Sequence, residues 1–316
     1  MKTKQRIYIL SAALLILVLL YLLLGLNPFI WRYALSLRIP KTIALLLVAS
    51  SIAFSSTVFQ TLTNNRILTP SVLGLDSLYL FIQSLIVFLF GSSTLARLGE
   101  NFNFILSVGL MVAFSLLLFQ LLFKREERNI FFLLLVGLVM GTFFQSLSTF
   151  MQVLIDPNEF LVIQNRMFAS FNNMNTEILW LALIISFLAV LFTLKDLKNL
   201  DILSLGRENA INLGVDYDFV VKKFLVLISI LVSVSTALVG PITFLGLLVV
   251  NLARELLRTF RHKYLIVGAI LIASIALTFG QLIAERLLNF STPISIIINF
   301  IGGLYFIFLL LKESKI

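Results

Sequence analysis

The stretch Leu194–Lys223, LKDLKNLDILSLGRENAINLGVDYDFVVKK, is a polar segment between two long apolar runs. Charged residues recur along it, and it contains no continuous apolar run long enough to cross a bilayer. It therefore has to lie in water while the runs on either side lie in a membrane.

The centre of this segment, Leu203–Asp216, has the pattern of a short amphipathic helix. Ser204 and Gly206 are suited to opening the helix, and Gly214 is suited to ending it. Glu208 suits the first turn, and the expected apolar face is Ala210, Ile211 and Leu213. A helix held on the water side could bind a soluble partner; an ordinary loop with one helical turn is the alternative interpretation.

The composition places the whole chain in a membrane. The chain has 316 residues, a mean hydropathy of +1.07 and only 12% charged residues, whereas a soluble domain carries roughly a quarter. The net charge of +9 comes from Lys and Arg that flank apolar spans, so nucleic-acid binding is not expected. Cysteine is absent and His262 is the only histidine, which excludes disulfides and His- or thiolate-based metal sites. Between Arg261 and Lys263, His262 is expected to be solvated at the membrane edge.

We expect an all-α, polytopic membrane protein with about ten crossings, each of about 20 residues. The expected crossings are residues 7–26, 42–62, 72–90, 104–123, 129–154, 177–194, 224–239, 242–256, 264–284 and 294–311. The run from Phe224 to Val250 is divided in two because Gly240-Pro241 suits a reversal. A single span there would place basic clusters on both sides of the membrane, against the positive-inside rule.

With ten crossings, most of the 24 Lys and Arg residues fall on one side of the membrane. This bias predicts that both termini and the segment 195–223 are cytoplasmic. The N-terminal apolar run lacks a cleavage site and is expected to remain as the first span. Residues 1–316 are expected to form a single membrane domain without metal or other cofactor.

Uncharged polar side chains form stripes on two of the expected spans. The second span contains Ser55 and Gln60; in the fifth, Thr142, Gln145, Thr149 and Gln152 recur at three- and four-residue steps, on one helix face. Such stripes either bind helices together or line a wet path, and two of them favour a path for a polar solute. Gly137 and Gly141 indicate close helix packing instead.

Charged residues at the outer ends of the spans have two interpretations. Arg38, Lys41 and Arg286 either form a positive collar for an acidic soluble partner or simply anchor the helices. The acid Asp76 is expected near the inner end of the third span and Glu285 at the outer end of the ninth, and neither has an evident acidic or histidine partner in the sequence. That absence disfavours ion-coupled transport.

Several motifs resemble the FecCD/BtuC-type permeases of ABC importers, in the order and spacing of that family. They are Arg38-Ile39-Pro40-Lys41, QTLTNNRILTPSVLG at Gln60–Gly74, LSLGRENAINLGV at Leu203–Val215, GPITFLGL at Gly240–Leu247 and PISI at Pro293–Ile296. The chain departs from the family at Val250 and Asn251, where Pro and His are usual, and at Asn64 and Arg66. The Val-Asn form resembles ferric-siderophore permeases of the catecholate or petrobactin type.

The resemblance implies a multi-pass permease of the cytoplasmic membrane that works by alternating access. Its implied partners are a pair of cytoplasmic ABC ATPases, an extracytoplasmic solute-binding lipoprotein and a second permease, identical or related. The ATPase-coupling residues it implies are Leu203, Ser204, Leu205, Gly206, Arg207, Glu208, Ala210, Leu213 and Gly214. It also implies that Arg38, Lys41 and Arg286 face the binding protein, and that the second and fifth spans face the path.

Two other function classes remain as alternatives. An ion-coupled secondary transporter of a polar solute would need paired titratable residues near the membrane midplane. An enzyme acting on lipid would need a catalytic cluster, which one histidine and scattered acids do not provide.

Overall fold

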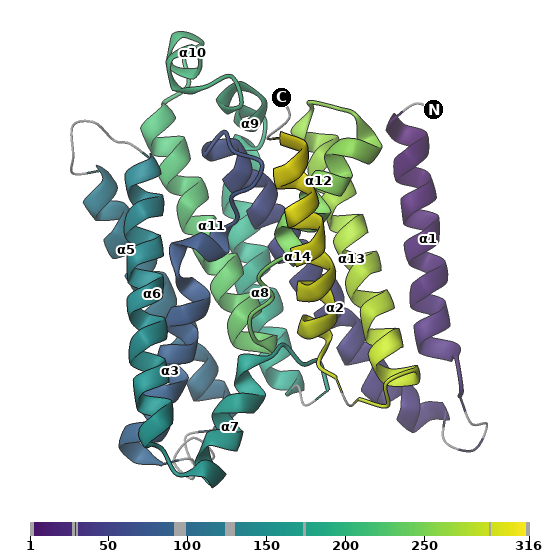
Figure 1. Cartoon of the computed structure of the whole chain (residues 1–316). Helices are drawn as coiled ribbons and strands as arrows, with labels where there is room; N and C mark the ends of the chain where they lie inside the picture. The colour runs from purple at the N-terminus through teal and green to yellow at the C-terminus, as the bar shows by residue number, and fades with distance from the viewer. Residues whose placement is uncertain are drawn as a thin grey trace.

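The computed structural model describes residues 3–26, 29, 31–91, 99–123, 130–172, 175–290 and 292–313. Every regular element in these ranges is helical, which confirms the all-α prediction (Figure 1). The elements are α1 (Thr3–Leu23), α2 (Trp31–Leu62), the 3₁₀ turn η1 (Pro70–Leu73), α3 (Leu75–Phe90), α5 (Glu100–Phe123), α6 (Ile130–Leu154), α7 (Pro157–Met167), α8 (Thr176–Thr193), η2 (Leu194–Asp196), α9 (Asn199–Leu203), α10 (Arg207–Asn212), α11 (Tyr217–Val239), α12 (Leu245–Leu257), α13 (His262–Arg286) and α14 (Ile294–Glu313). Some basic residues used for the orientation prediction lie outside the described residues, namely Lys2, Arg97, Lys124, Arg125, Arg128 and Lys315.

Each of the ten expected spans coincides with a helix. Within the described ranges, seven helices are long and apolar enough to cross a membrane: α1, α2, α5, α6, α8, α11 and α13. Of the others, α3 has 16 residues and α12 has 13, and the apolar part of α14 is also short. A multi-pass membrane protein is therefore shown, whereas the number of ten crossings stays a prediction.

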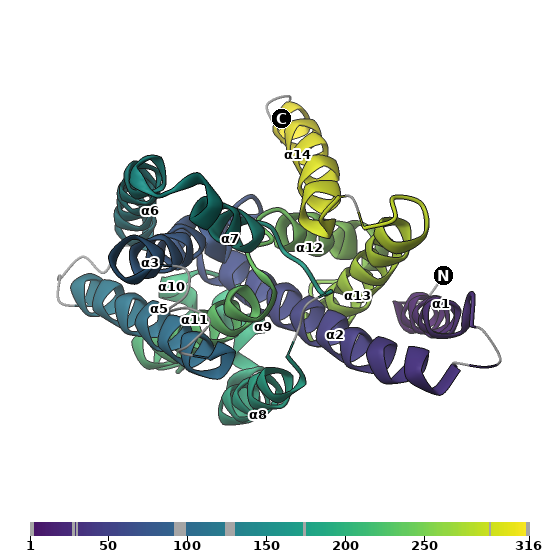
Figure 2. The same ribbon diagram turned by 90° about the horizontal axis from the view of Figure 1, so that it is seen from below.

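Helix α2 forms the centre of the bundle. It packs against α11, α12 and α13, and Figure 2 shows it running through the middle of the molecule. Its buried face is rich in small residues, including Ala44, Ala49 and Ala53, which are fully buried. Small side chains let neighbouring backbones approach closely, which is how helices associate in lipid.

Residues 70–73 already pack inside the bundle as the 3₁₀ turn η1, before α3 begins. Helix α3 is therefore shorter than the expected span at residues 72–90. The turn η1 packs against α2, α6 and α11, and Gly74 then starts α3 with a φ of +76°. A Cβ on Gly74 would lie 2.7 Å from the Cα of Gly141 and 2.9 Å from the carbonyl oxygen of Gly137. The predicted close packing at Gly137 and Gly141 is confirmed, and its partner is Gly74.

The predicted reversal at Gly240-Pro241 is also confirmed. Helix α11 ends at Val239, Gly240 has a φ of +99°, and α12 begins at Leu245. A Cβ on Gly246, at the start of α12, would clash with Ser56 in the last two turns of α2. Further along α12, Asn251 donates to the carbonyl of Arg66 beyond the end of α2. Helix α12 therefore runs back towards the end of the bundle at which α11 began.

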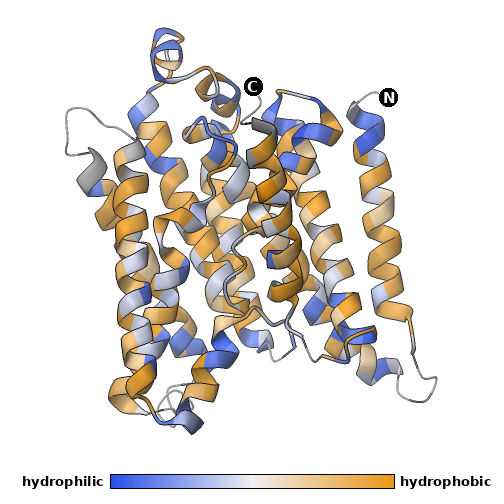
Figure 3. Cartoon of the chain, in the orientation of Figure 1, coloured by the Kyte–Doolittle hydropathy of each residue, from blue (hydrophilic) through white to orange (hydrophobic). Residues whose placement is uncertain are grey.

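Figure 3 shows the apolar residues along the length of the bundle and the hydrophilic residues gathered at its two ends. The start of α1 and the end of α14 lie at the same end of the bundle as α9 and α10 (Figure 1). Near the start of α1, the guanidinium of Arg6 donates to the carbonyl of Leu256 at the end of α12.

Candidate functional site

The polar segment between α8 and α11 forms two short helices rather than the expected single one. Helix α9 ends at Leu203, and Gly206, with a φ of +93°, precedes α10. Gly214 follows α10 with a φ of +83°. The predicted roles of Gly206 and Gly214 as the start and end of a helix are confirmed. Leu203, Ser204 and Leu205 belong to the end of α9 and the turn after it, because positive φ at Gly206 interrupts the helix.

Helix α10 and the residues flanking it present apolar side chains to the outside of the molecule, and these side chains are called the α10 surface below. Leu205 is 55%, Ile211 45% and Leu213 60% exposed. Ala210, which was expected on the same face, is buried against the bundle. Arg207 and Glu208 are exposed, and Arg207 lies over the ring of Tyr217 at 5.7 Å. Exposed apolar side chains on a water-facing segment indicate a surface for a protein partner.

A chain of hydrogen bonds connects this segment to the bundle. Asp201 Oδ1 accepts from the backbone N–H of His262 at 2.8 Å and contacts its Nδ1 at 2.7 Å. His262 Nε2 lies 2.8 Å from the Thr61 hydroxyl. The link joins α9, the N-terminus of α13 and α2.

The expectation that His262 is solvated is wrong, since the side chain is only 4% exposed. Its charged neighbours in the sequence were misleading because a helix start turns successive side chains in different directions. A second link joins Lys223 on α11 to Asp196 in η2, at 2.6 Å. The polar segment is therefore held to several membrane helices at once.

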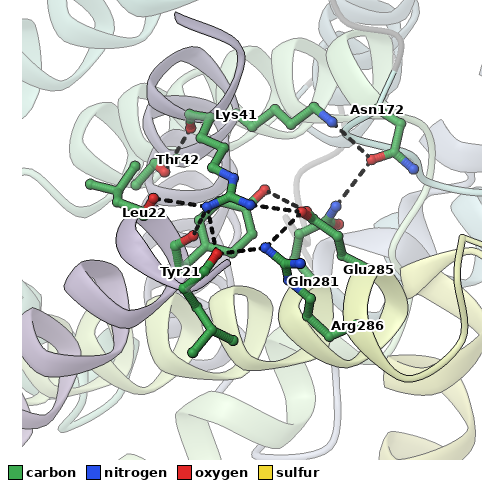
Figure 4. Close-up of polar contacts among 10 residues, drawn as sticks. Tyr21, Leu22, Lys41, Thr42, Asn172, Gln281, Glu285 and Arg286 are labelled. Atoms are coloured by element: carbon green, nitrogen blue, oxygen red, sulfur yellow. Dashed lines mark hydrogen bonds and ion pairs between the residues drawn. The ribbon is translucent and has the colours of Figure 1, made fainter. Parts of the chain in front are cut away.

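At the opposite end, Arg38 and Arg286 hold the C-terminal end of α1; Figure 4 shows Arg286 there with Tyr21 and Leu22. Arg38 donates to the carbonyls of Tyr21, Leu22 and Leu24 at 3.3, 2.9 and 2.9 Å. Arg286 donates to the carbonyl of Leu24 at 2.6 Å. Guanidinium groups satisfy the free carbonyls of a helix end and favour its negative pole.

Glu285 lies between these two arginines. It accepts from the Tyr21 hydroxyl at 3.2 Å and lies 3.7 Å from Arg38 and 3.9 Å from Arg286. Lys41 donates to Asn172 at 3.3 Å, and Gln281 donates to the same oxygen at 3.1 Å (Figure 4). The three basic residues are thus brought to one end of the bundle, as expected. The side chain of Arg38 is only 12% exposed and that of Arg286 is 35% exposed. Their charges therefore act first in contacts within the bundle, with the end of α1 and with Glu285. Their role in docking stays a prediction.

The polar stripe on α6 divides into an outer and an inner part. Thr142, Gln145 and Thr149 are exposed, and the two threonine hydroxyls donate to carbonyls of their own helix. Gln152 points inward and donates to Ser84 on α3 at 3.0 Å and to Ser148 at 2.8 Å. Gln152 therefore binds two helices together, while the other three side chains leave a polar strip on the outside of the bundle.

Ser55 and Gln60 do not lie on an open surface. Ser55 is fully buried and Gln60 is 2% exposed, and their side-chain polar atoms have no hydrogen-bond partner in the described part of the chain. The assignment of Ser55 and Gln60 to the translocation path stays a prediction; in this structure α2 is the central helix and is covered on most sides.

The family comparison fits these features. Residues 14–312 match the family model described as the FecCD transport family. The chain belongs to that family.

Two Bacillus permease proteins resemble this chain over most of its length. It is 62% identical to the petrobactin import system permease protein YclO of Bacillus subtilis, over 90% of both chains. It is 36% identical to the petrobactin import system permease protein FatC of Bacillus anthracis, over 88% of this chain and 79% of that one. A solved structure of a metal-chelate type ABC transporter in an inward-facing conformation matches with a TM-score of 0.84 at 24% identity, covering 98% of this chain and all of the other. That likeness shows the fold.

In this FecCD-family chain, Asn251 stands where the family motif usually has His. Its side-chain amide donates to Leu247 in its own helix at 2.9 Å and to the carbonyl of Arg66 at 3.0 Å. It therefore ties α12 to the segment that follows α2. Asp201, His262 and Asn251 were not expected to form cross-helix contacts, since nothing in their spacing along the sequence connects them.

Proposed function

We propose that this chain is the transmembrane permease of an ABC importer that moves a ferric siderophore of the petrobactin type across the cytoplasmic membrane. The family membership and the names of the two Bacillus relatives support the transported substrate. The chain carries no covalent chemistry and works by alternating access. Residues 1–316 form one permease domain with a cytoplasmic coupling segment at 195–223.

The observation that carries the proposal is the apolar surface of α10, formed by Leu205, Ile211 and Leu213, on a segment that has to lie in water. A soluble ATPase subunit would cover it. Force applied to α10 would reach the membrane helices through α9 and the contacts of Asp201 with His262 and of His262 with Thr61. Both termini, on the same side as α10, would then be cytoplasmic.

The opposite end of the bundle faces the solute-binding protein in this proposal. Lys41 and Arg286 would provide its positive charge, with Arg38 mainly supporting α1. A second permease would pair along α6, so that Thr142, Gln145 and Thr149 line a shared path. A glutamine amide facing lipid is unfavourable, and an aqueous path or a partner helix removes that cost.

The coupling proposal is tested by replacing Leu213 with Glu. The introduced charge would fall in the ATPase interface, so we expect loss of ATPase co-purification and of siderophore-bound iron uptake, with normal membrane insertion. Leu161→Glu is the matched control: Leu161 is 55% exposed, but it lies on α7 at the other end of the bundle. Equal ATPase recovery with the two variants would refute the assignment.

The substrate and the energy source are tested in cells that depend on this permease for uptake of iron bound to petrobactin. Uptake should stop when the ATPase carries an inactivating substitution. Uptake that persists would favour an ion-coupled secondary transporter instead. Failure to transport petrobactin-bound iron, with transport of another ferric chelate intact, would refute the substrate alone.

A further inference from the structure

A small cavity lies inside the bundle where two helix interruptions meet. It is bordered by η1 and the start of α3, by the last turns of α11, and by the non-helical residues 240–244. Its volume is about 20 Å³, enough for one water-sized particle. Polar side chains line much of it, and these are Ser56, Thr69, Ser71, Asp76, Thr236 and Thr243.

Asp76 is the only acid among the described residues that line this cavity. Its Oδ1 accepts from the Thr236 hydroxyl at 3.1 Å, and the Ser71 hydroxyl faces the same carboxyl group. Its Oδ2 is buried and has no hydrogen-bond partner in the described structure. A buried carboxylate oxygen without a partner is strongly unfavourable, so an occupant of the cavity has to satisfy it.

A proton on Asp76 would neutralise the carboxyl group, and Oδ2 as a hydroxyl would then donate to the facing Ser71 hydroxyl or to a water molecule in the cavity. A water molecule would satisfy Oδ2 but would leave a net negative charge inside the membrane, which is costly. No Lys or Arg is among the described residues that line the cavity. A small cation meets both requirements while Asp76 stays ionised.

The donor set indicates which cation fits. All the polar lining side chains offer oxygen, which suits hard cations. Only one negative charge is present, and no group of three or more His, Cys, Asp or Glu is found among the described residues, which disfavours a divalent ion. Interrupted helices add backbone carbonyls at such places, as in transporters that bind Na⁺. We propose that the cavity beside Asp76 binds one Na⁺ ion.

Such an ion would join four parts of the fold: α2 through Ser56, α3 through Asp76, α11 through Thr236 and the segment before α12 through Thr243. Its occupancy would stabilise the arrangement of these helices seen here. The inference does not depend on the transported substrate or on the ATPase.

The test measures Na⁺ binding to the purified full-length permease in detergent. At constant ionic strength, with choline replacing Na⁺, the thermal unfolding midpoint of the wild type should rise with Na⁺ and saturate. Equilibrium binding of ²²Na⁺ should reach one ion per chain. Asp76→Asn should abolish both effects, whereas Glu285→Gln, which alters the partly buried acid beside Arg38 and Arg286, should retain them.

Thr236→Val is the second variant, in case Asp76→Asn does not fold. It removes one hydroxyl that holds Asp76 and should weaken Na⁺ binding about 2- to 12-fold, the equivalent of one neutral hydrogen bond. Saturable ²²Na⁺ binding that Thr236→Val leaves unchanged would overturn the location. A thermal unfolding midpoint that changes with pH but not with Na⁺ concentration would overturn the sodium assignment in favour of a proton. Wild-type protein that binds no ²²Na⁺ would overturn it outright.

Discussion

Asp201→Asn tests whether the Asp201 carboxylate fastens the coupling segment to α13. Asp201, on α9, accepts two hydrogen bonds from His262 at the first residue of α13. The residue at the N-cap of α13, Arg261, makes no side-chain cap hydrogen bond. Asp201 therefore supplies the cap from another helix, and its charge favours the positive pole of α13.

The expected cost follows from this geometry. Asn keeps an acceptor oxygen but loses the charge, so each bond falls from the charge-assisted to the neutral range, a loss of about 1 kcal/mol per bond. The Asp201 side chain is 43% exposed, so solvent screening reduces the sum. We expect a loss of about 1 kcal/mol in unfolding free energy, and about twice that for Asp201→Ala, which also leaves a buried backbone N–H unpaired.

Two assays follow the change. Denaturant unfolding of the purified permease gives the stability, and substrate-stimulated ATPase activity of the reassembled importer gives the coupling. We expect coupling to fall while ATPase co-purification remains, because the α10 surface is unchanged. Asp216→Asn is the matched control: Asp216 caps α11 locally, and Asn caps a helix equally well. If the two variants behave alike in both assays, the link through His262 does not transmit force.

Three further predictions concern packing and charge. Gly246→Ala should destabilise the permease by about 1–3 kcal/mol because the added Cβ would lie 2.0 Å from Ser56 Oγ. Gly303→Ala is the control and should be neutral or stabilising, since a Cβ there would have no atom within 4 Å. Adding Ser56→Gly to Gly246→Ala should restore the thermal unfolding midpoint. Gln145→Leu should leave the unfolding midpoint unchanged but reduce iron uptake; normal uptake would remove α6 from the path. Arg38→Ala should free the C-terminal end of α1, and this would be measured as faster hydrogen exchange of the backbone amides of residues 20–24. If these amides stay as protected from exchange as in the wild type, Arg286 alone is enough to hold this helix end.

Much of the helix pattern follows from the sequence alone. The local signals are the length of each apolar run, the polar residues between the runs, and the glycines Gly206, Gly214 and Gly240. Each of the spans expected from them coincides with a helix in the structure. The family resemblance was equally readable because its motifs are continuous blocks of sequence. The existence of a water-exposed segment between two spans needed only the distribution of charge.

The tertiary structure decided which residues meet. In a membrane protein, apolar side chains face both lipid and neighbouring helices, so hydrophobic periodicity does not fix how a helix is rotated or what it touches. The sequence therefore could not show that α2 is central and buries Ser55 and Gln60, or that His262 is buried against Asp201. Nor could it show that Glu285 lies between two arginines. Those facts depend on contacts between residues far apart in the chain, which only the packed bundle fixes.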